Sequence, residues 1–424
     1  MKRVGLFICS HDGISCRYAG VGTAASGYMK GVEKFILDNP QINLTCHAIT
    51  GKYKSDSYTY NQELLNKNTE ICKKTGGSVE FVLNYSDGSY QYGDINSWYV
   101  ASSAAAQIIS NNIIQNKYDQ VVILALDTPF AWTPQIVKKQ NFDFDGRIIG
   151  AWVPHSTSLI HERGDYNLDR LKWEMNVVDS VNTTTDLYVT FLNEYMKDHL
   201  RLNYGVLEGK LLPLLNGIVH SEVPRYSNNE IENTLLKYSI PTDKPLVISF
   251  GRGAKYKGFD IFLNTIKYLS DMPIHFVLQC SFFDENDPLL KNLAENAKEI
   301  PNLTFLPMFS FEFPRKLLQW KKTELCAVLS ENEPGAFIPA EIRVYGQAIA
   351  LVSDRDGLPC QIIHGTDGYV TSLSDPQQIS EKIRMIVMMK ESEKKRIRKT
   401  GQELITNEYD IVNNFCYFLD SVIT

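Results

Sequence analysis

Two positive side chains stand directly after an apolar run in the second half of the sequence. The run LVISF begins at Leu246 and is followed by GRGAKYKGFD, in which Arg252 and Lys257 precede a helical pattern. The N–H groups at the start of a helix favour negative charge, and Arg and Lys add full positive charges. Taken alone, the segment is equally consistent with a phosphate site and with a solvated turn.

Two carboxylates follow the apolar run CAVLS, which begins at Cys326. The next residues are ENEPGAFIPAEIRVYG, so Glu333 leaves the expected strand and Glu341 lies inside the following helix. Carboxylates accept hydrogen bonds from hydroxyl groups, so one end of the segment suits a polyol and the other a ribose. A plain alternative, one carboxylate at a helix start and one on the surface, stays open.

Polar residues also follow apolar runs in the first half of the chain. In open α/β sheets, ligands bind outside the carboxyl ends of the strands, so such residues could face a ligand. The alternative for each of them is a plain structural role in a loop or at the end of a strand. They are His11 and Asp12 after the first run, Asp127 at the end of VVILALD, His155 in AWVPHSTS, and Glu162 and Arg163 beyond it.

The elements that must position these residues are short apolar runs alternating with helical patterns. Runs that are apolar at consecutive positions are typical of strands covered on both faces, as in parallel sheets. One helical stripe extends from Phe259 to Leu269. The pattern predicts an α/β fold. The runs begin at Val4, Val121, Arg147, Asp186, Leu246, Ile274, Cys326 and Ala348.

A chain of 424 residues is long enough for two domains of ~200 residues each. The strand–helix alternation weakens over residues 221–243, a polar stretch with prolines near each end, so we expect the interdomain linker there. A second irregular region, residues 84–97, is rich in Gly, Tyr and Asp. It is predicted to be a substrate loop or a plain surface loop.

Composition excludes several classes of protein. The chain is 44% hydrophobic with a net charge of −6, which argues against disorder and against binding nucleic acid. Its eight cysteines are scattered, which argues against a zinc site or a disulfide framework. The first apolar run is too short for a signal sequence, and no stretch is long enough to span a membrane. We therefore expect a cytoplasmic protein.

Taken together, GR-x4-KG, E-x7-E and the trailing DG…G-x-DGY segment resemble the second domain of retaining glycosyltransferases of the family 4 type, which have the GT-B fold. The segment HDGISCRYAGVGTAASGYMKG resembles the first glycine loop of that family, with Gly20 and Gly22. His155 stands at a strand end where these enzymes usually carry a histidine. The stretch ending at Asn216–Ile218 and the tail NEYDIVNNFCYFLDSVI complete the resemblance.

The resemblance implies two Rossmann-like domains facing across a cleft. The first, acceptor-side domain would cover residues 1–220, and the second, nucleotide-sugar-binding domain residues 244–405. A C-terminal helix within residues 406–424 would pack back on the first domain.

The resemblance also implies a role for each matching residue. Arg252 and Lys257 would bind the donor diphosphate, Glu333 the sugar hydroxyls and Glu341 the ribose. His155 would line the reaction centre and, with Glu333, Arg252 and Lys257, would form the catalytic set. Further donor contacts would come from Gly20, Gly22, Gly251, Gly335, Ala336 and Phe337, and acceptor contacts from His11, Asp12 and Asp127.

The implied activity is transfer of a sugar from a nucleotide-diphosphate sugar, such as a UDP-sugar, to a hydroxyl acceptor, with retention by a front-face mechanism. No metal or other cofactor would be required. The acceptor would be a glycan, a lipid-linked sugar or a small natural product, and peripheral membrane contact stays open. Alternatives are an epimerase or hydrolase on the same fold, or a non-catalytic sugar-nucleotide-binding partner of a transferase.

The sequence departs from the family pattern in three places. Asp356-Gly357 and Gln361 stand where the family usually has Gly-Gly followed by Glu, and PAEIRVYG replaces LEAMACG. Tyr18-Ala19-Gly20 replaces a first Gly-Gly. We expect the first two differences to shift the preference for donor or nucleotide, and the third to narrow the approach to the phosphates.

Overall fold

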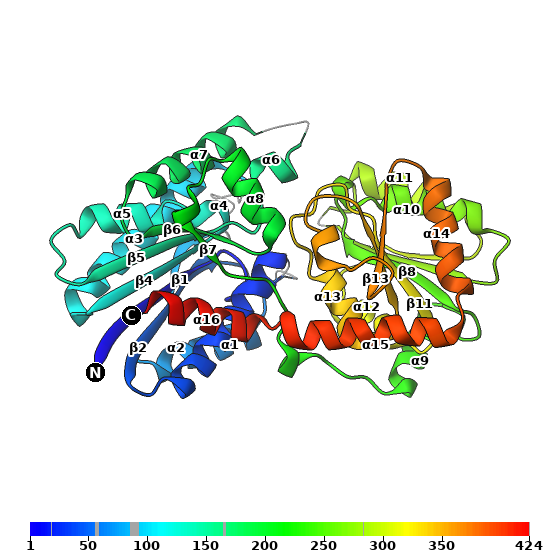
Figure 1. The fold of residues 1–424 in the computed structure, drawn as a ribbon, viewed down its shortest axis with the longest axis horizontal. Coiled ribbons are helices and arrows are strands. Elements are labelled where there is room, and N and C mark those ends of the chain that lie inside the picture. Colours follow the sequence, from blue (N-terminus) through cyan, green and yellow to red (C-terminus); the bar gives the residue numbers. More distant parts are fainter. Residues whose placement is uncertain (18, 56–58, 85–92, 164–166, 283, 424) are drawn as a thin grey trace. The chain divides into compact units, whose positions relative to one another are not determined.

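Two parallel β-sheets, each covered by helices, make up the chain (Figure 1). The computed structural model describes residues 1–424 except 18, 56–58, 85–92, 164–166, 283 and 424. The chain divides into two compact units. The first consists of Met1–Val219 with Asp410–Thr424, and the second of His220–Tyr409.

The first unit contains a seven-stranded sheet in the order β3-β2-β1-β4-β5-β6-β7. Its strands are β1 (Lys2–Cys9), β2 (Ile42–Lys52), β3 (Val79–Asn84), β4 (Gln120–Leu126), β5 (Arg147–Val153), β6 (Leu187–Phe191) and β7 (Leu211–Pro213). Its helices are α1 (Gly20–Asp38), α2 (Gln62–Lys74), α3 (Ile95–Asn116), α4 (Asp127–Phe130), α5 (Thr133–Gln140), α6 (Ser158–His161), α7 (Leu168–Thr183), α8 (Glu194–Asn203) and α16 (Ile411–Val422), with the 3₁₀ turn η2 (Glu208–Lys210).

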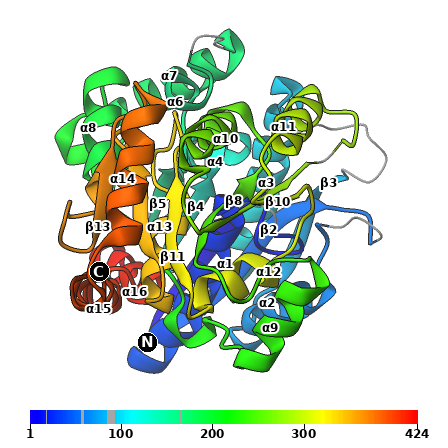
Figure 2. The same ribbon diagram turned by 90° about the vertical axis from the view of Figure 1, so that its right-hand side faces the viewer.

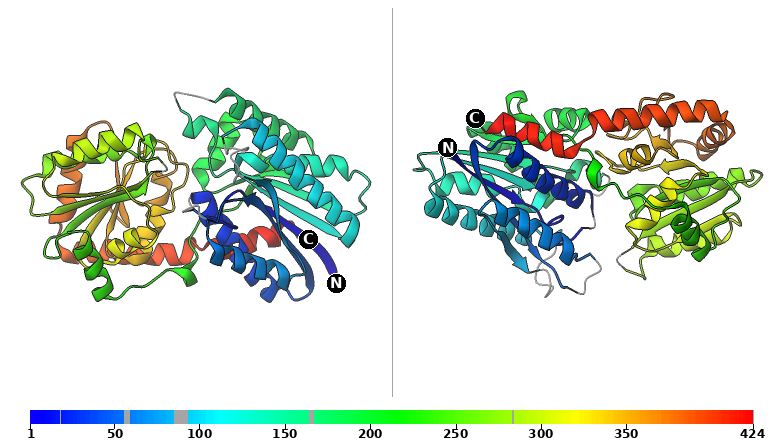
Figure 3. Two further views of the ribbon diagram at one scale, coloured as in Figure 1. Left: turned by 180° about the vertical axis from the view of Figure 1, so that it is seen from behind. Right: turned by 90° about the horizontal axis from the view of Figure 1, so that it is seen from below.

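Helix α16 brings the end of the chain back to the first unit, where it lies along α1 (Figure 3). Two glycines of α1 make this close packing possible. A Cβ atom at Gly27 would lie 2.5 Å from the side chain of Ile411, and one at Gly31 would lie 2.5 Å from Phe415. The C-terminal helix therefore forms part of the first unit, as the fold prediction expected.

The second unit contains a six-stranded sheet in the order β10-β9-β8-β11-β12-β13. Its strands are β8 (Leu246–Arg252), β9 (His275–Ser281), β10 (Leu303–Leu306), β11 (Thr323–Val328), β12 (Ile349–Ser353) and β13 (Gly368–Thr371). Its helices are α9 (Asn228–Lys237), α10 (Phe259–Ile266), α11 (Pro288–Lys298), α12 (Glu312–Gln319), α13 (Ile338–Tyr345), α14 (Pro376–Met388) and α15 (Glu391–Glu408). The 3₁₀ turns are η3 (His220–Glu222), η4 (Lys255–Lys257), η5 (Lys267–Leu269) and η6 (Pro359–Gln361).

Helices cover both faces of this second sheet (Figure 2). Helices α10, α11 and α14 pack on one face through a core that includes Phe262, Leu293 and Ile383, all of them buried. Helices α12 and α13 contact each other and the strands β11 and β12. Burial on both faces explains why the strands read as continuous apolar runs.

The expected α/β class is confirmed, because each apolar run singled out above coincides with a strand, and the stripe from Phe259 forms α10 and η5. Residues 221–243, expected as a linker, lie in the second unit and contain α9. Residues 85–92 of the expected substrate loop lie outside the described residues, whereas Asp94 caps α3 by accepting a hydrogen bond from Ser97 N at 3.1 Å. None of the described helices is both long and apolar enough to span a bilayer.

Candidate active site

The residues of the second unit with the clearest chemistry lie where three neighbouring strands end. Strands β8, β11 and β12 are adjacent and parallel, so the segments after them meet at one edge of the sheet. The strand order also reverses between β8 and β11, which is the topological switch point where α/β sheets bind ligands. Arg252, Lys257, Glu333 and Asp356 all belong to these segments.

A glycine brings the segment after β8 against the end of β11. Gly258 has a backbone φ of 66°, and a Cβ atom there would lie 2.0 Å from the carbonyl oxygen of Leu329. Only glycine adopts this conformation in this space without strain. Glu331 N also donates a 2.7 Å hydrogen bond to Tyr256 O, which joins the two segments directly. Lys257 is thereby placed beside the residues that follow β11.

Lys257 and Glu333 form an ion pair between Nζ and Oε2. Their side chains are only 17% and 9% exposed, so little water competes for either charge. Burial acts to lower the pKa of Lys257, but the neighbouring Glu333 carboxylate outweighs it and holds that pKa above its ordinary value. The lysine therefore stays charged at neutral pH.

Two residues that depart from the family pattern support this region. Glu333 N donates a 2.9 Å hydrogen bond to Oδ2 of Asp356, and Gly357 N donates a 3.0 Å bond to Glu333 O. The amide Nε2 of buried Gln361 donates to Ala336 O at 2.9 Å. The family usually has a glutamate at this position, and an ionised glutamate could not donate this hydrogen bond. Gln361 therefore stabilises the turn before α13 through a contact that glutamate cannot make.

Glu341 lies in α13 and forms an ion pair with Arg315 of α12. Both side chains are largely buried, at 16% and 12% exposure respectively. The Arg315 guanidinium carbon lies 3.6 Å from the centroid of the Phe311 ring, and its Nη1 donates to Phe311 O at 2.6 Å. Arg315 was not anticipated from the sequence, and it fixes the carboxylate expected to bind a ribose.

The remaining donor-binding candidates lie on the same two segments. Arg252 ends β8, and its guanidinium donates to the hydroxyl of Tyr256. Gly251 lies within β8 itself. Gly335 and Ala336 form the turn that leads to α13, and Phe337 is the residue from which that helix begins.

The candidates of the first unit also follow neighbouring strands, since β1, β4 and β5 are adjacent in its sheet. His11 follows β1, Asp127 follows β4 and His155 follows β5. Burial lowers the pKa of His155 to about 4, with Asp127 acting in the opposite direction and His11 in the same one. The pKa of His11 is also lowered by burial and raised by Asp127. Asp127 therefore interacts electrostatically with both histidines, and His11 with His155. Because both pKa values are lowered, both imidazoles are neutral at pH 7.

Asp127 has an unusual backbone. Its φ of 60° lies in the left-handed region, which costs a non-glycine residue about 1–3 kcal/mol and is concentrated at functional sites. The indole N–H of Trp152 donates to Asp127 O at 3.2 Å and holds this conformation. The ring of His155 stacks on Tyr28 with centroids 6.5 Å apart, and Tyr28 stacks on Phe415 of α16 at 5.0 Å.

Asp12 is completely buried, and its carboxylate faces the start of α1. It accepts hydrogen bonds from Gly13 N at 2.8 Å and from Ala19 N at 2.9 Å. Gly22 lies in the first turns of α1, where a Cβ atom would fall 2.4 Å from Asp12 Oδ1. Gly22 thus makes room for the Asp12 carboxylate, while Gly20 is the exposed first residue of the helix.

Within the part of the chain that the structure describes, no group of three or more His, Cys, Asp or Glu side chains is arranged to hold a metal ion. The candidate site residues form two sets, and each set lies at the carboxyl edge of the sheet in its own unit. The supporting residues Tyr256, Arg315 and Gln361 carry no motif, and only the departure at Gln361 signalled one of them in the sequence.

Solved structures with the same fold are glycosyltransferases of the GT-B type, so this chain has the GT-B fold with two Rossmann-like domains. Sucrose-phosphate synthase of Thermosynechococcus elongatus has a TM-score of 0.74 at 13% identity, over 100% of this chain and 99% of that chain. HepE of Anabaena, solved with UDP-glucose, has a TM-score of 0.68 at 13% identity over 99% of both chains. A glycosyltransferase of Rickettsia africae has a TM-score of 0.69 at 12% identity, over 99% of this chain and 97% of that chain.

The sequence itself points to a family in the second unit. Residues 230–403 match the family model described as Glycosyl transferases group 1, and these residues contain Lys257, Glu333 and Glu341. No curated protein sequence matches the chain.

Proposed function

We propose that the protein is a retaining glycosyltransferase that moves a sugar from a nucleotide-diphosphate sugar to a hydroxyl acceptor. The observation that carries this proposal is the Lys257–Glu333 ion pair at the switch point of the second sheet. Both residues lie within the part of the chain that matches the Glycosyl transferases group 1 model. In this proposal the Lys257 ammonium binds the diphosphate and the Glu333 carboxylate binds sugar hydroxyls.

The chemistry of the transfer fits these groups. Breaking the bond between sugar and phosphate leaves negative charge on the diphosphate, and fixed positive groups in a dry site stabilise that charge. Lys257 and Arg252 are these positive groups. Glu333 binds the sugar hydroxyls, and Glu341 binds the ribose. Gly20, Gly22 and Gly251 let the backbone approach the donor, and the backbone amides of Gly335, Ala336 and Phe337 face its phosphate or sugar.

UDP is the nucleotide we propose for the donor, because HepE was solved with UDP-glucose and the likeness to it extends over nearly the whole chain. His155 lines the reaction centre, and His11, Asp12 and Asp127 lie on the acceptor side. The acceptor attacks from the face that the leaving group occupies, and a donor phosphate oxygen takes its proton.

No metal is needed in this proposal, because Lys257 and Arg252 provide the positive charge at the diphosphate. The protein acts in the cytoplasm on a glycan, a lipid-linked sugar or a small natural product, with peripheral membrane contact for a lipid-linked acceptor.

The test is incubation of the protein with UDP-sugars and a panel of acceptors, with NMR used to identify the anomer of the product. We expect a product that retains the donor configuration and a rate that EDTA leaves unchanged. Lys257→Met should weaken UDP binding in calorimetry by ~10-fold or more. Lys255→Met is the matched control, because that exposed lysine lies in the same 3₁₀ turn.

Three results would contradict the proposal. Release of free sugar at the same rate with and without acceptor would indicate a hydrolase. UDP-sugar binding without turnover across the acceptor panel would favour a non-catalytic partner. Equal effects of the two lysine substitutions would remove Lys257 from the donor site.

A further inference from the structure

A buried carboxylate of the first unit lies outside every site described so far. Glu174 of α7 is 0% exposed. Its carboxylate accepts hydrogen bonds from Ser158 N at 3.0 Å, Tyr204 Oη at 2.6 Å, Thr128 Oγ1 at 3.3 Å and Arg170 Nε at 2.8 Å. A buried carboxylate is costly unless its oxygens are paired in this way.

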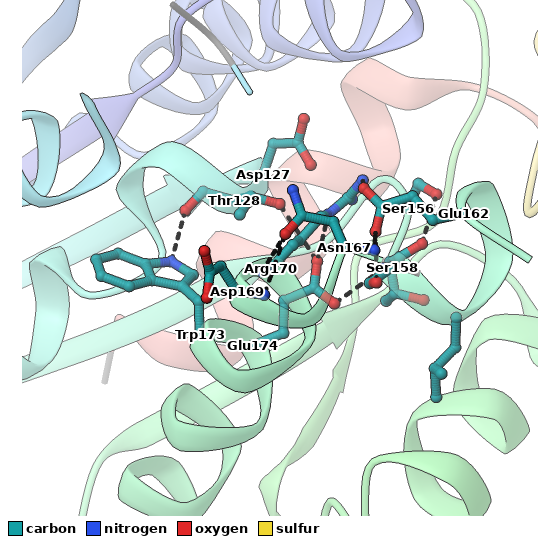
Figure 4. Close-up of polar contacts among 12 residues, drawn as sticks. Asp127, Thr128, Ser156, Ser158, Glu162, Asn167, Asp169, Arg170, Trp173 and Glu174 are labelled. Atoms are coloured by element: carbon teal, nitrogen blue, oxygen red, sulfur yellow. Dashed lines mark hydrogen bonds and ion pairs between the residues drawn. The ribbon is translucent and has the colours of Figure 1, made fainter. Parts of the chain in front are cut away.

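Glu174 binds one residue in each of two loops. Thr128 belongs to the loop that carries Asp127, and Ser158 belongs to the loop that carries His155 (Figure 4). Thr128 directly follows Asp127, and Ser158 lies three residues after His155 as the first residue of α6. The neighbouring Trp173 strengthens the first connection, because its indole N–H donates to Thr128 O at 3.0 Å. One turn of α7 therefore holds the segments that follow β4 and β5.

Salt bridges fix the orientation of this carboxylate. Arg170, one helical turn earlier, pairs with Glu174 through Nε and with Glu162 through Nη1 at 3.2 Å. Glu162 in turn accepts hydrogen bonds from Ser158 Oγ at 2.5 Å and from Asn167 N at 3.2 Å. Glu162 was considered above as a possible ligand contact, and the structure shows its carboxylate in this network.

Figure 4 shows the carboxylate of Asp127 pointing away from the network, while the adjacent Thr128 points into it. The network thus engages the backbone and neighbours of the site residues and leaves the Asp127 carboxylate outside. An apolar residue in place of Glu174 would leave Ser158 N and Tyr204 Oη without this acceptor, at a cost of about 1–3 kcal/mol for each buried group.

We propose that Glu174 is a positioning residue of the transferase, which sets the placement of His155 relative to Asp127 by binding the two loops that carry them. This inference rests on the proposed function for its catalytic consequence, and on the hydrogen bonds above for its structural one. Glu174 itself touches neither donor nor acceptor.

The experiment compares Glu174→Gln and Tyr204→Phe with a matched control. Glutamine has the same shape as glutamate but only one acceptor oxygen. Its Nε2 must therefore face either the donor Arg170 Nε or the donor Tyr204 Oη, and one of these hydrogen bonds to residue 174 is lost. Phenylalanine removes only the hydroxyl that donates to Glu174. Tyr118→Phe is the control, because Tyr118 is buried in the same unit and its hydroxyl contacts His47 at 3.3 Å, away from both loops.

Two readouts are measured on the full chain, with thermal unfolding to verify the fold of each variant. The first is steady-state kinetics with a UDP-sugar. We expect kcat to fall by ~10²-fold in Glu174→Gln and ~10-fold in Tyr204→Phe, because a displacement of about 1 Å costs a factor of this size. The KM for the donor should change less than ~2-fold, because the hydrogen bonds of Glu174 go to none of the proposed donor-binding residues. The second readout is the NMR resonance of the His155 ring, which should shift in both variants and not in Tyr118→Phe.

The two readouts separate the possible failures. If the wild-type chain transfers no sugar, the proposed function fails, and the His155 resonance alone decides whether Glu174 positions the loop. If the wild-type chain is active and both variants match Tyr118→Phe in kcat, the positioning role is overturned. An unshifted His155 resonance in folded Glu174→Gln overturns it as well.

Discussion

The ion pair between Lys257 and Glu333 makes a quantitative prediction about stability. Lys257→Met removes the cation and leaves the carboxylate of Glu333 largely buried beside an apolar side chain. The lysine stem keeps its packing, because methionine has a similar length. A matched second variant, Glu333→Gln, removes the negative charge and leaves the lysine in place.

The exposures of the two side chains, 17% and 9%, set the expected size of the effect. Breaking a fully buried pair by removing one partner costs about 3–5 kcal/mol, and a surface pair is worth about 0–1 kcal/mol. This pair lies nearer the buried limit, so we expect Lys257→Met to lower the free energy of unfolding of the second unit by about 2–3 kcal/mol. For a unit of this size that is a decrease in Tm of ~4–12 °C.

The assay is differential scanning calorimetry of the wild type, both single variants and the double variant Lys257→Met/Glu333→Gln. The double variant should be more stable than the sum of the single effects predicts, by about 1–2 kcal/mol, because it leaves no uncompensated charge. Lys255→Met should change Tm little, since that lysine is exposed. Single effects that add to within about 0.5 kcal/mol would show that the two residues are not energetically coupled, and would refute the electrostatic argument.

Three further predictions follow from particular residues. Gly258→Ala should destabilise the second unit by at least about 2 kcal/mol, because its Cβ would meet Leu329 O in a left-handed backbone; an unchanged Tm would contradict the tight approach after β8. Gly22→Ala should lower Tm in the wild-type background and lower it less in an Asp12→Gly background, which lacks the carboxylate that the new methyl group would meet; an equal loss of Tm in both backgrounds would contradict the contact with Asp12. His155 has a pKa lowered by burial from 6.5 to about 4, so the unfolded chain takes up the proton first and stability is lost as pH falls from about 6.5 to 4, by roughly 3 kcal/mol in total. His155→Gln should reduce the fall in the urea-unfolding free energy over this range by roughly 3 kcal/mol, and a pH dependence equal to that of the wild type would refute the assignment.

The sequence predicted the inner strands, except β2, because they are covered on both faces. Strand β2 was not singled out, since polar residues such as Asn43, Thr45 and His47 interrupt its apolar residues. Strands such as β4, buried along its whole length, read as unbroken apolar runs. The edge strands β3, β7, β10 and β13 were not singled out, since they are short or only partly buried; β10, for example, is intermediate at every position. An edge strand lacks the two-sided burial that makes a run recognisable.

The candidate site was predictable where chemistry is local and not where it depends on distant partners. Lys257 and Glu333 stand at strand ends, and the topology brings them together. Arg315 and Glu174 carry no such signal, because their roles depend on helix packing between residues far apart in the sequence. The sequence shows that Gln361 stands where the family usually has Glu, but it does not show why. The structure supplies the reason, since the Gln361 amide donates a hydrogen bond to Ala336 O.

The return of α16 to the first unit makes the second unit an insert between two points of the first. The chain leaves after Val219 and re-enters at Asp410, and these points are neighbours, since Ile218 pairs with Asp410 and Ile411 N donates to Ile218 O at 3.3 Å. A short peptide could therefore bridge the two ends and yield the first lobe alone. The same junction could accept another Rossmann-like lobe as an exchangeable insert, with both chain termini left undisturbed.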